Sequence, residues 1–382
     1  MRFLTAGESH GKELTVILEG LPSGLPLLAA DVDGQLARRQ LGVGRGARQK
    51  IESDRVEFTA GVRLGETTGG PVCMRIPNKD WKSWTEIMAA EPSDEPPGRP
   101  LTLPRPGHAD LAGCLKHGLH DGRNILERSS ARETAARVAA GAAARRLLAA
   151  FGVEIASCVL SVGSVRAAER PAFENCLGLD PELPMPGEAE AEEARRLILE
   201  ARKAGDTLGG STLVIVRGLL PGLGSHAHWD RRLDGRLGQA LLSIPSAKAV
   251  EIGDAMEAST KPGSEMLDPI GYEEGAGFTR PSNRMGGLEG GITNGEELRL
   301  VTIHKPVPTL IRPLPSTHLG TKEAGKAHKE RSDSCVVVPG AVVAEAMAAL
   351  VLAAAYGEKF GGDSLAEMKR NWEGYRKQLE AF

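Results

Sequence analysis

The sequence predicts a mixed fold in which helices pack between β-sheets, and three observations carry this prediction. Two Ala-rich segments, 131–150 and 340–356, favour helix but have too little side-chain volume to fill a core alone, so they should pack closely. Apolar runs at 211–220 and 298–304 have the composition of buried strands. The Gly-rich loops carry charged residues rather than a neutral spacer composition, so no domain linker is evident, although the length permits one large domain or two to three smaller ones.

The other elements follow from local patterns. Asp31 is placed to cap a helix over 31–40, and Ser130 with Glu133 forms a capping box for the helix 131–150, which Gly152 should end. The two Ala-rich helices end in similar sequences, LAAFG and LAAAYG. Internal duplication and chance explain this similarity equally well. Further segments predict strands at 15–18 and 154–165, helices at 190–204 and 230–242, and an extended Pro-rich connection at 91–107.

Charge and composition exclude several classes of protein. Forty-seven basic and 50 acidic residues give a net charge of −3. A chain with this charge has no overall electrostatic attraction to nucleic acid or to an anionic membrane. Aromatic residues make up only 4%, which disfavours a stacking surface for single-stranded nucleic acid. The apolar stretch 341–356 contains Glu345 and is shorter than the roughly 20 residues of a membrane span. With Glu8 and His10 so early, the N-terminus does not resemble a signal peptide, and we expect a cytoplasmic location.

Metal and disulfide sites are not expected. The five cysteines are odd in number and form no C-x-x-C pair, which argues against a disulfide framework and a thiolate zinc site. His117 and His120 near Asp110 match no zinc ligand spacing, so they stay unassigned. His226 and His228 resemble a ligand pair, but no third ligand is evident nearby, and a flexible loop after a strand is the preferred interpretation.

Several clusters are suited to binding an anion. The run 38–48 alternates arginine with glycine, which brings guanidinium groups and backbone amides within reach of phosphate or carboxylate oxygens; a solvated basic loop is the alternative. Arg128 to Glu133 lies at the predicted N-terminus of a long helix, where free amides favour an anion, although simple capping would also explain its serines. A third cluster, 282–295, is glycine-rich.

Three titratable side chains lie in motifs typical of catalysis. His10 stands between glycines in GESHG, and His108 follows a rigid turn in RPGHAD; each could act as an acid or base near neutral pH, or belong to a structural turn. Asp333 lies between Arg331 and Cys335 and could be a base or an ion-pair partner. Together with the arginines, these residues indicate an enzyme acting on a phosphorylated, acidic small molecule, but they do not identify its reaction.

The motifs taken in order resemble the chorismate synthase family over nearly the whole chain. They are GESHG, GRGARQKIESD, RPGHADL, DGRNILERSSARET, KAVEIGD, NRMGGLEGGITNG, HKPVPTL and RSDSCVVVPG. One departure is Asp254-Ala255, where the family has Asp-Gly. The resemblance implies an α+β fold with helices sandwiched between antiparallel sheets, one domain over residues 1–382, and a homotetramer. It also implies 1,4-elimination of phosphate from 5-enolpyruvylshikimate 3-phosphate, which gives chorismate with reduced FMN and no net redox change.

The resemblance also implies residue roles. His10 would protonate the leaving phosphate, His108 would face the flavin and stabilise its reduced form, and Asp333 would assist proton removal through the flavin N5 position. Arg39 and Arg45 match NADP positions of some members, where NADPH is the reductant, and with Arg48 they are expected to bind the substrate's phosphate and carboxylates. The residues expected to hold FMN are Arg128, Ser129, Ser130, Pro245, Ser246, Gly290, Lys305, Pro306, Val307, Pro308, Thr309 and Arg331.

Two other classes of protein compete with this interpretation. A flavin oxidoreductase with net hydride transfer would need a G-x-G-x-x-G between strand and helix, which we do not find in that context. A non-catalytic anion-binding protein would need the arginines but not both histidines and Asp333. The segment 256–279 is the candidate lid, because reduced flavin reacts with oxygen and a closing loop would exclude solvent.

Overall fold

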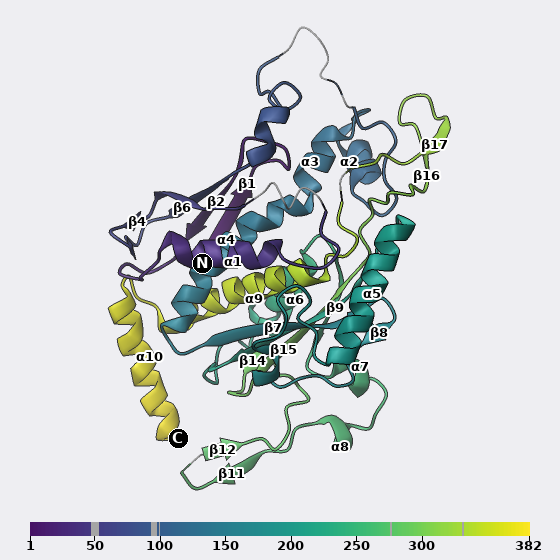
Figure 1. The fold of residues 1–382 in the computed structure, drawn as a ribbon. Coiled ribbons are helices and arrows are strands. Elements are labelled where there is room, and N and C mark those ends of the chain that lie inside the picture. The colour runs from purple at the N-terminus through teal and green to yellow at the C-terminus, as the bar shows by residue number, and fades with distance from the viewer. Residues whose placement is uncertain (47–52, 93–97, 99, 276, 331) are drawn as a thin grey trace.

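The chain forms two antiparallel sheets with a layer of helices between them (Figure 1). This computed structural model describes residues 1–46, 53–92, 98, 100–275, 277–330 and 332–382. The first sheet has the order β1(Arg2–Ala6), β2(Glu13–Glu19), β6(Val72–Pro77), β3(Glu57–Ala60). The second has the order β10(Ala247–Ile252), β15(Leu298–His304), β9(Gly210–Arg217), β7(Glu154–Val162), β8(Val165–Arg166). The predicted α+β sandwich is therefore confirmed.

The central layer includes three helices of twelve or more residues, and alanine and glycine let two of them touch. These are α1(Ala29–Gln40), α4(Thr134–Ala149) and α9(Val337–Phe360). At the crossing of α4 and α9, a Cβ added to Gly141 would lie 2.4 Å from the Cβ of Ala346, so only glycine allows this approach. The close packing predicted from the small side chains is therefore found where the two Ala-rich helices cross.

Helix α9 is long and apolar enough to cross a membrane, but the structure buries it. Of its most apolar window, 94% is covered by the rest of the protein, which makes it a core helix. Glu345, near its middle, accepts hydrogen bonds from Arg38, Arg145 and Ser157 at 2.5–2.8 Å. The charge that interrupts the apolar run is therefore paired inside the core, as a buried carboxylate requires.

Helix ends differ from the sequence predictions in two places. Asp31 is not the N-cap of α1: the helix begins at Ala29, and the Asp31 carboxylate accepts from the Leu28 amide at 2.8 Å. Ser130 does cap the next segment by accepting from the Arg132 amide, but that segment starts as a 3₁₀ turn, Ala131–Glu133. Glu133 turns away to accept from Thr5 and Arg137, so the capping box is only half formed.

Other boundaries agree within a few residues. Gly152 has φ +78° and ends α4, as predicted. The predicted strand 154–165 is split into β7 and β8, and the predicted helix 230–242 begins as a 3₁₀ turn, Trp229–Arg231, before α6(Leu233–Leu242).

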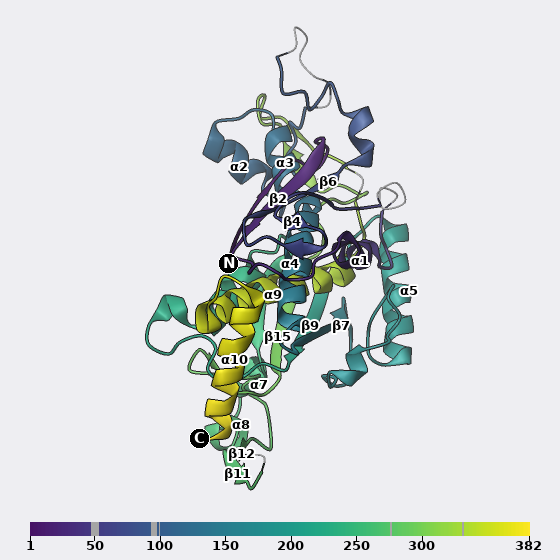
Figure 2. The same ribbon diagram turned by 90° about the vertical axis from the view of Figure 1, so that its left-hand side faces the viewer.

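Smaller elements surround the sandwich. Helices α2(Asp110–His117) and α3(Arg123–Ser129) lie at one end with the pair β16(Pro315–Thr317) and β17(Ala324–Lys326) (Figures 1 and 2). At the opposite end lie α7(Ala255–Ala258), α8(Gly263–Met266) and the pair β11(Gly271–Glu273) and β12(Gly277–Thr279). The remaining elements are β4(Val62–Arg63), β5(Glu66–Thr67), α5(Glu188–Ala204), β13(Leu288–Glu289), β14(Ile292–Thr293), α10(Leu365–Glu380) and 3₁₀ turns at Lys79–Ser83 and Glu174–Cys176.

Candidate active site

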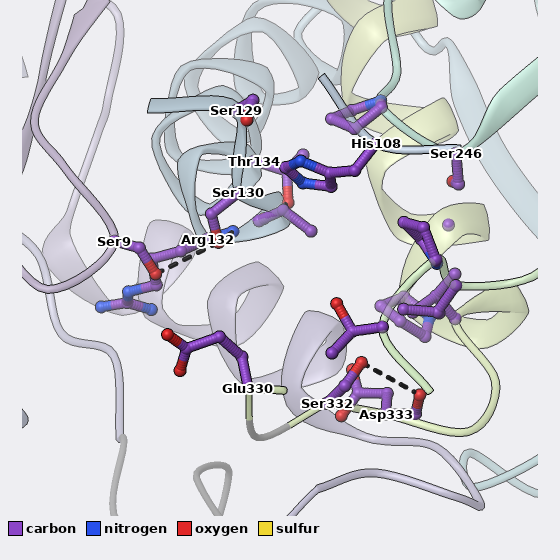
Figure 3. Close-up of a pocket in the computed structure, with 18 of the residues that line it drawn as sticks. Ser9, His108, Ser129, Ser130, Arg132, Thr134, Ser246, Glu330, Ser332 and Asp333 are labelled. Atoms are coloured by element: carbon purple, nitrogen blue, oxygen red, sulfur yellow. Dashed lines mark hydrogen bonds between the residues drawn. The ribbon is translucent and has the colours of Figure 1, made fainter. Parts of the chain in front are cut away.

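A cavity of about 480 Å³ opens where several loops meet the ends of the central helices. Its wall is formed by the C-terminal end of α3, the start of α4, the first turns of α9, and loops at 105–109, 244–246, 305–309 and 332–333. In Figure 3, Ser9, Ser130 and Arg132 lie across the open space from His108 and Ser246, with Ser332 and Asp333 along a third side. The volume lies within the range of small-molecule sites.

Most of the predicted site residues line this one cavity. They are His10, His108, Asp333, Arg39, Arg45, Ser129, Ser130, Pro245, Ser246, Lys305, Pro306, Val307, Pro308 and Thr309. Arg48 and Arg331 lie outside the described residues. The fold thus brings together residues that are more than 300 positions apart in sequence, such as His10 and Asp333.

Two predicted residues lie away from the cavity wall. Arg128 points toward the first strand, where its guanidinium donates to the carbonyls of Thr5 and Gly7. Gly290 occupies the turn between β13 and β14 with φ +60° and nothing near its missing side chain. The candidate lid is also remote: no described residue of 256–279 lines the cavity, and β11–β12 lie at the opposite end of the molecule from α2 and α3 (Figure 2). The described residues of this segment therefore do not cover the cavity of their own chain.

His10 is held tightly in its loop. The side chain is 8% exposed, and its Nδ1 lies 2.9 Å from the Oε1 atom of Glu127. One face of its ring stacks on Trp84, with centroids 3.8 Å apart and planes at 21°. This ring therefore has a fixed orientation at the cavity wall.

His108 is also backed by a buried carboxylate. Its Nδ1 lies 2.6 Å from Oδ1 of Asp110, which is fully buried. Asp110 also accepts from the backbone amide and the guanidinium of Arg105 at 2.8–3.0 Å. Burial raises the pKa of Asp110, but hydrogen bonds from His108 and Arg105 outweigh it and hold that pKa well below its usual range. Asp110 is therefore an anion that orients two cavity side chains.

The arginines form a cluster whose charge is only partly balanced. Arg39 lies 3.8 Å from Asp54, and Arg132 donates to both oxygens of the same carboxylate at 2.7 Å. Burial is the main reason that the pKa of Arg39 is lowered to about 10; the charge of Asp54 opposes this shift, and the charges of Arg132 and Arg45 add to it. Like charges held this close are suited to a ligand with negative charge.

Asp333 is engaged by the arginine loop. Arg45 donates to its Oδ2 at 2.5 Å, and the Gly46 amide donates to its Oδ1 at 2.6 Å. The Nε atom of Arg45 is buried without a hydrogen-bond partner among the described residues. A buried guanidinium nitrogen of this kind needs an acceptor, which an anionic ligand would supply.

The segment 305–309 forms the opposite wall. Lys305 donates to the Gly107 carbonyl, and burial followed by the charge of Lys248 lowers its pKa. Pro306, Val307 and Pro308 give this wall an apolar surface. Ser246 bonds to Nδ1 of the buried His304 at 2.9 Å, which fixes the hydroxyl.

Sequence reasoning missed the groups that stand behind the site. Glu127 and Trp84 come from separate parts of the chain, and no local pattern relates them to His10, which both contact. Asp54 ends the motif GRGARQKIESD, and its pairing with Arg39 agrees with the alternative in which the basic run pairs with nearby acids. Arg105 and Asp110 could have been found, because both lie within the RPGHAD motif that singled out His108. Among the described residues, no group of three His, Cys, Asp or Glu side chains could hold a metal ion.

Comparison with known proteins explains this arrangement. A family model described as chorismate synthase matches residues 1–356. The chain belongs to the chorismate synthase family. Chorismate synthases from Thermus thermophilus and Moorella thermoacetica are each 52% identical, over 100% of this chain and 100% and 99% of their own length. The one from Pelobacter propionicus is 50% identical over the full length of both chains.

Solved structures agree with the sequence comparison. A crystal structure of chorismate synthase superposes with a TM-score of 0.80 at 38% identity, covering 100% of this chain and 98% of that one. The chain is therefore an enzyme of the chorismate synthase type, a lyase of aromatic biosynthesis, and the oxidoreductase alternative is not favoured.

Proposed function

We propose that the cavity is where this lyase converts 5-enolpyruvylshikimate 3-phosphate to chorismate and phosphate, with reduced FMN bound beside the substrate. The observation that carries the proposal is the convergence of a buried arginine cluster, two carboxylate-backed histidines and Asp333 on one cavity of about 480 Å³. A substrate with a phosphate and two carboxylates needs several cations, and an elimination needs an acid for the leaving group and a base for the ring proton.

The residues present fit a flavin. The apolar wall at Pro306–Pro308 suits a flat ring system, the hydroxyls of Ser129, Ser130 and Ser246 can bond to its polar edge, and the partnerless Arg45 Nε can bond to an anion. When bound, reduced flavin would lend electron density to the substrate and recover it. The residues that would hold it are Ser129, Ser130, Pro245, Ser246 and Lys305 to Thr309, with Arg128, Gly290 and Arg331 expected from the family resemblance alone.

The protein's own groups divide the remaining work. Arg39 and Arg45, with Arg48, would bind the phosphate and carboxylates and hold the ring in place. His10 would give its proton to the phosphate oxygen as the carbon–oxygen bond breaks and the electron pair leaves with phosphate. Asp333 would assist removal of the ring proton, and His108 would hold a proton at the flavin side of the cavity. The burial of His10 and Arg39 keeps water from these groups.

We also propose that the chain is one domain, acts in the cytoplasm and assembles as a homotetramer. One apolar core cluster contains residues from both sheets and from α1, α4 and α9, which supports a single domain. Leu4 and Ile17 expose their side chains on the outer face of the first sheet, and Tyr272, Phe278 and Phe382 form an exposed aromatic cluster. Exposed apolar groups of this kind are typical of protein interfaces.

The deciding experiment is an anaerobic assay with dithionite-reduced FMN that follows chorismate absorbance and phosphate release. We expect equal amounts of both products, and a loss of turnover in His10→Ala and His108→Ala proteins that still bind FMN. His228→Ala is the matched control, because His228 is exposed and pairs with Asp230 away from the cavity. A parallel run with NADPH in place of dithionite tests whether the enzyme reduces its own flavin. No chorismate from folded, flavin-loaded protein would overturn the proposal.

A further inference from the structure

We propose that Glu127 is a positioning residue for the reaction: it fixes the tautomer and orientation of His10, so that only Nε2 exchanges a proton with the substrate. The inference rests on the proposed function for its kinetic consequence. Its structural part is that the Glu127 carboxylate fixes the tautomer of the His10 imidazole, and this tautomer can be measured without enzyme turnover.

Glu127 holds the His10 loop at three points. Its backbone carbonyl accepts from the Ser9 amide at 3.0 Å, and its Oε2 accepts from the His10 amide at 2.8 Å. Its Oε1 then meets His10 Nδ1 at 2.9 Å. Backbone and ring of the same residue are therefore tied to one side chain of α3, and the ring cannot rotate without breaking a bond to a fully buried carboxylate.

The chemistry of these contacts determines where the proton is. An ionised carboxylate only accepts hydrogen bonds, so Nδ1 must carry a hydrogen whether His10 is neutral or charged. Proton exchange is then left to Nε2. The stacked Trp84 ring restricts the imidazole from one face, so that tautomer and direction are both set before a ligand arrives.

Arg123 keeps this carboxylate in place. It donates to Glu127 Oε1 at 3.3 Å and to Glu330 at 2.9 Å, and Glu330 in turn contacts His328 at 3.1 Å. Burial raises the pKa of Glu330, but hydrogen bonds from His328 and Arg123 outweigh it and bring it to about 2. Glu127 is thus the inner end of a chain of ionised groups that crosses from α3 to the segment before Asp333.

The proton balance of the step is simple. Charged His10 gives the Nε2 proton to an oxygen of the phosphate, the ring carbon–oxygen bond breaks, and its electron pair leaves with the phosphate. His10 remains neutral with its hydrogen on Nδ1, which is the form that Glu127 binds. The carboxylate therefore stabilises the charged form before transfer and the correct neutral tautomer after it.

Glu127→Gln is the discriminating variant. Both carboxylate oxygens face hydrogen-bond donors, namely His10 Nδ1, the His10 amide and Arg123. An amide of the same shape can turn its NH₂ group toward the ring and Arg123, so that the ring loses its acceptor or becomes one itself. It can instead turn the NH₂ group toward the His10 amide, so that two donors oppose each other and the loop is pushed away. Glu133→Gln is the matched control: Glu133 is also a buried carboxylate, but it accepts from Thr5 and Arg137 rather than from a histidine.

The experiment combines kinetics with the tautomer. We would measure kcat and KM anaerobically and record solid-state NMR of protein labelled with ¹⁵N in its imidazoles, assigning His10 by its absence in His10→Gln. We expect wild-type His10 to carry hydrogen on Nδ1. In Glu127→Gln kcat should fall about 10- to 100-fold, at most the lower limit of the roughly 10²- to 10⁴-fold contribution of acid–base catalysis, with KM and FMN binding changed less than about threefold. Where the amide NH₂ faces the ring, the hydrogen should also move to Nε2. Glu127→Asp, which keeps the charge, should recover part of kcat.

Three results would overturn the inference. One is a wild-type His10 that carries its hydrogen on Nε2 alone. This NMR result comes from the wild-type protein and does not depend on the folding of a Glu127 variant. Another is Glu127→Gln with unchanged kcat and tautomer. The third is an equal loss of activity and thermal stability in Glu127→Gln and Glu133→Gln, which would make the role structural. A wild-type enzyme that makes no chorismate would instead overturn the proposed function, and the NMR result distinguishes the two failures.

Discussion

Replacing Gly141 by alanine should destabilise the protein although alanine is the better helix former. The new Cβ would lie 2.4 Å from Ala346 Cβ and 2.5 Å from its Cα, whereas carbon atoms prefer separations of about 3.5–4 Å. Helices α4 and α9 would have to move apart by about 1 Å. Overpacking a core by one methyl group costs about 1–3 kcal/mol, and the higher helix propensity of alanine returns up to about 1 kcal/mol. We expect a net loss of about 1–2 kcal/mol.

Gly357→Ala is the control for this substitution. Gly357 lies in α9, but nothing comes within 4 Å of its missing side chain. The same methyl group should therefore stabilise the helix there by up to about 1 kcal/mol. Urea unfolding of both variants at one protein concentration, followed by circular dichroism, measures the difference. Equal stabilities of the two variants, or a Gly141→Ala protein more stable than wild type, would refute the packing argument.

Two further predictions concern buried ionisable groups. Burial lowers the pKa of His304 to about 4, whereas a histidine in the unfolded chain has a pKa of about 6.5. The neutral, buried His304 therefore contributes fully to the free energy of unfolding above about pH 6.5, and this contribution is lost as the pH falls to about 4. Urea titrations at pH 7.5 and 5 should show a larger fall for wild type than for His304→Gln, and parallel curves would contradict this. Asp110→Asn should cost about 3–5 kcal/mol at pH 7, because it leaves Arg105 buried without its carboxylate. It should also slow turnover by removing the acceptor for His108 Nδ1, and unfolding curves and kcat like those of wild type would contradict it.

The sequence determined the layers of the fold better than the ends of its helices. The Ala-rich segments and the apolar runs at 211–220 and 298–304 identify buried elements, because their composition reflects burial directly. Asp31 was misplaced because a carboxylate can satisfy the amide of Leu28 from inside the first turn as well as from the cap. The same holds for Glu133, whose side chain is taken by Thr5, a residue that only the tertiary fold brings near.

The cavity shows the same division between local and long-range information. Glycine-flanked histidines and Gly-Arg repeats identify the lining, since exposure of a catalytic side chain requires loops that can turn sharply. Glu127 could not be predicted because nothing in the local sequence separates it, the residue that holds His10, from Glu133, which holds Arg137. Only the three-dimensional neighbours of these residues reveal the difference.

The pairing of the cavity arginines with carboxylates affects how strongly the site attracts an anionic ligand from a distance. Arg132 and Arg39 share Asp54, Arg105 faces Asp110, and Arg45 faces Asp333, so cation and carboxylate stand within 4 Å in each case. Beyond a Debye length, roughly 8 Å at physiological salt, a one-to-one pair acts as a short dipole, and only the one arginine in excess of these three carboxylates acts as a positive charge. With a net charge of −3, the chain as a whole does not attract anions from a distance. Ligand capture should therefore vary little with ionic strength, and discrimination takes place inside the cavity, at contact.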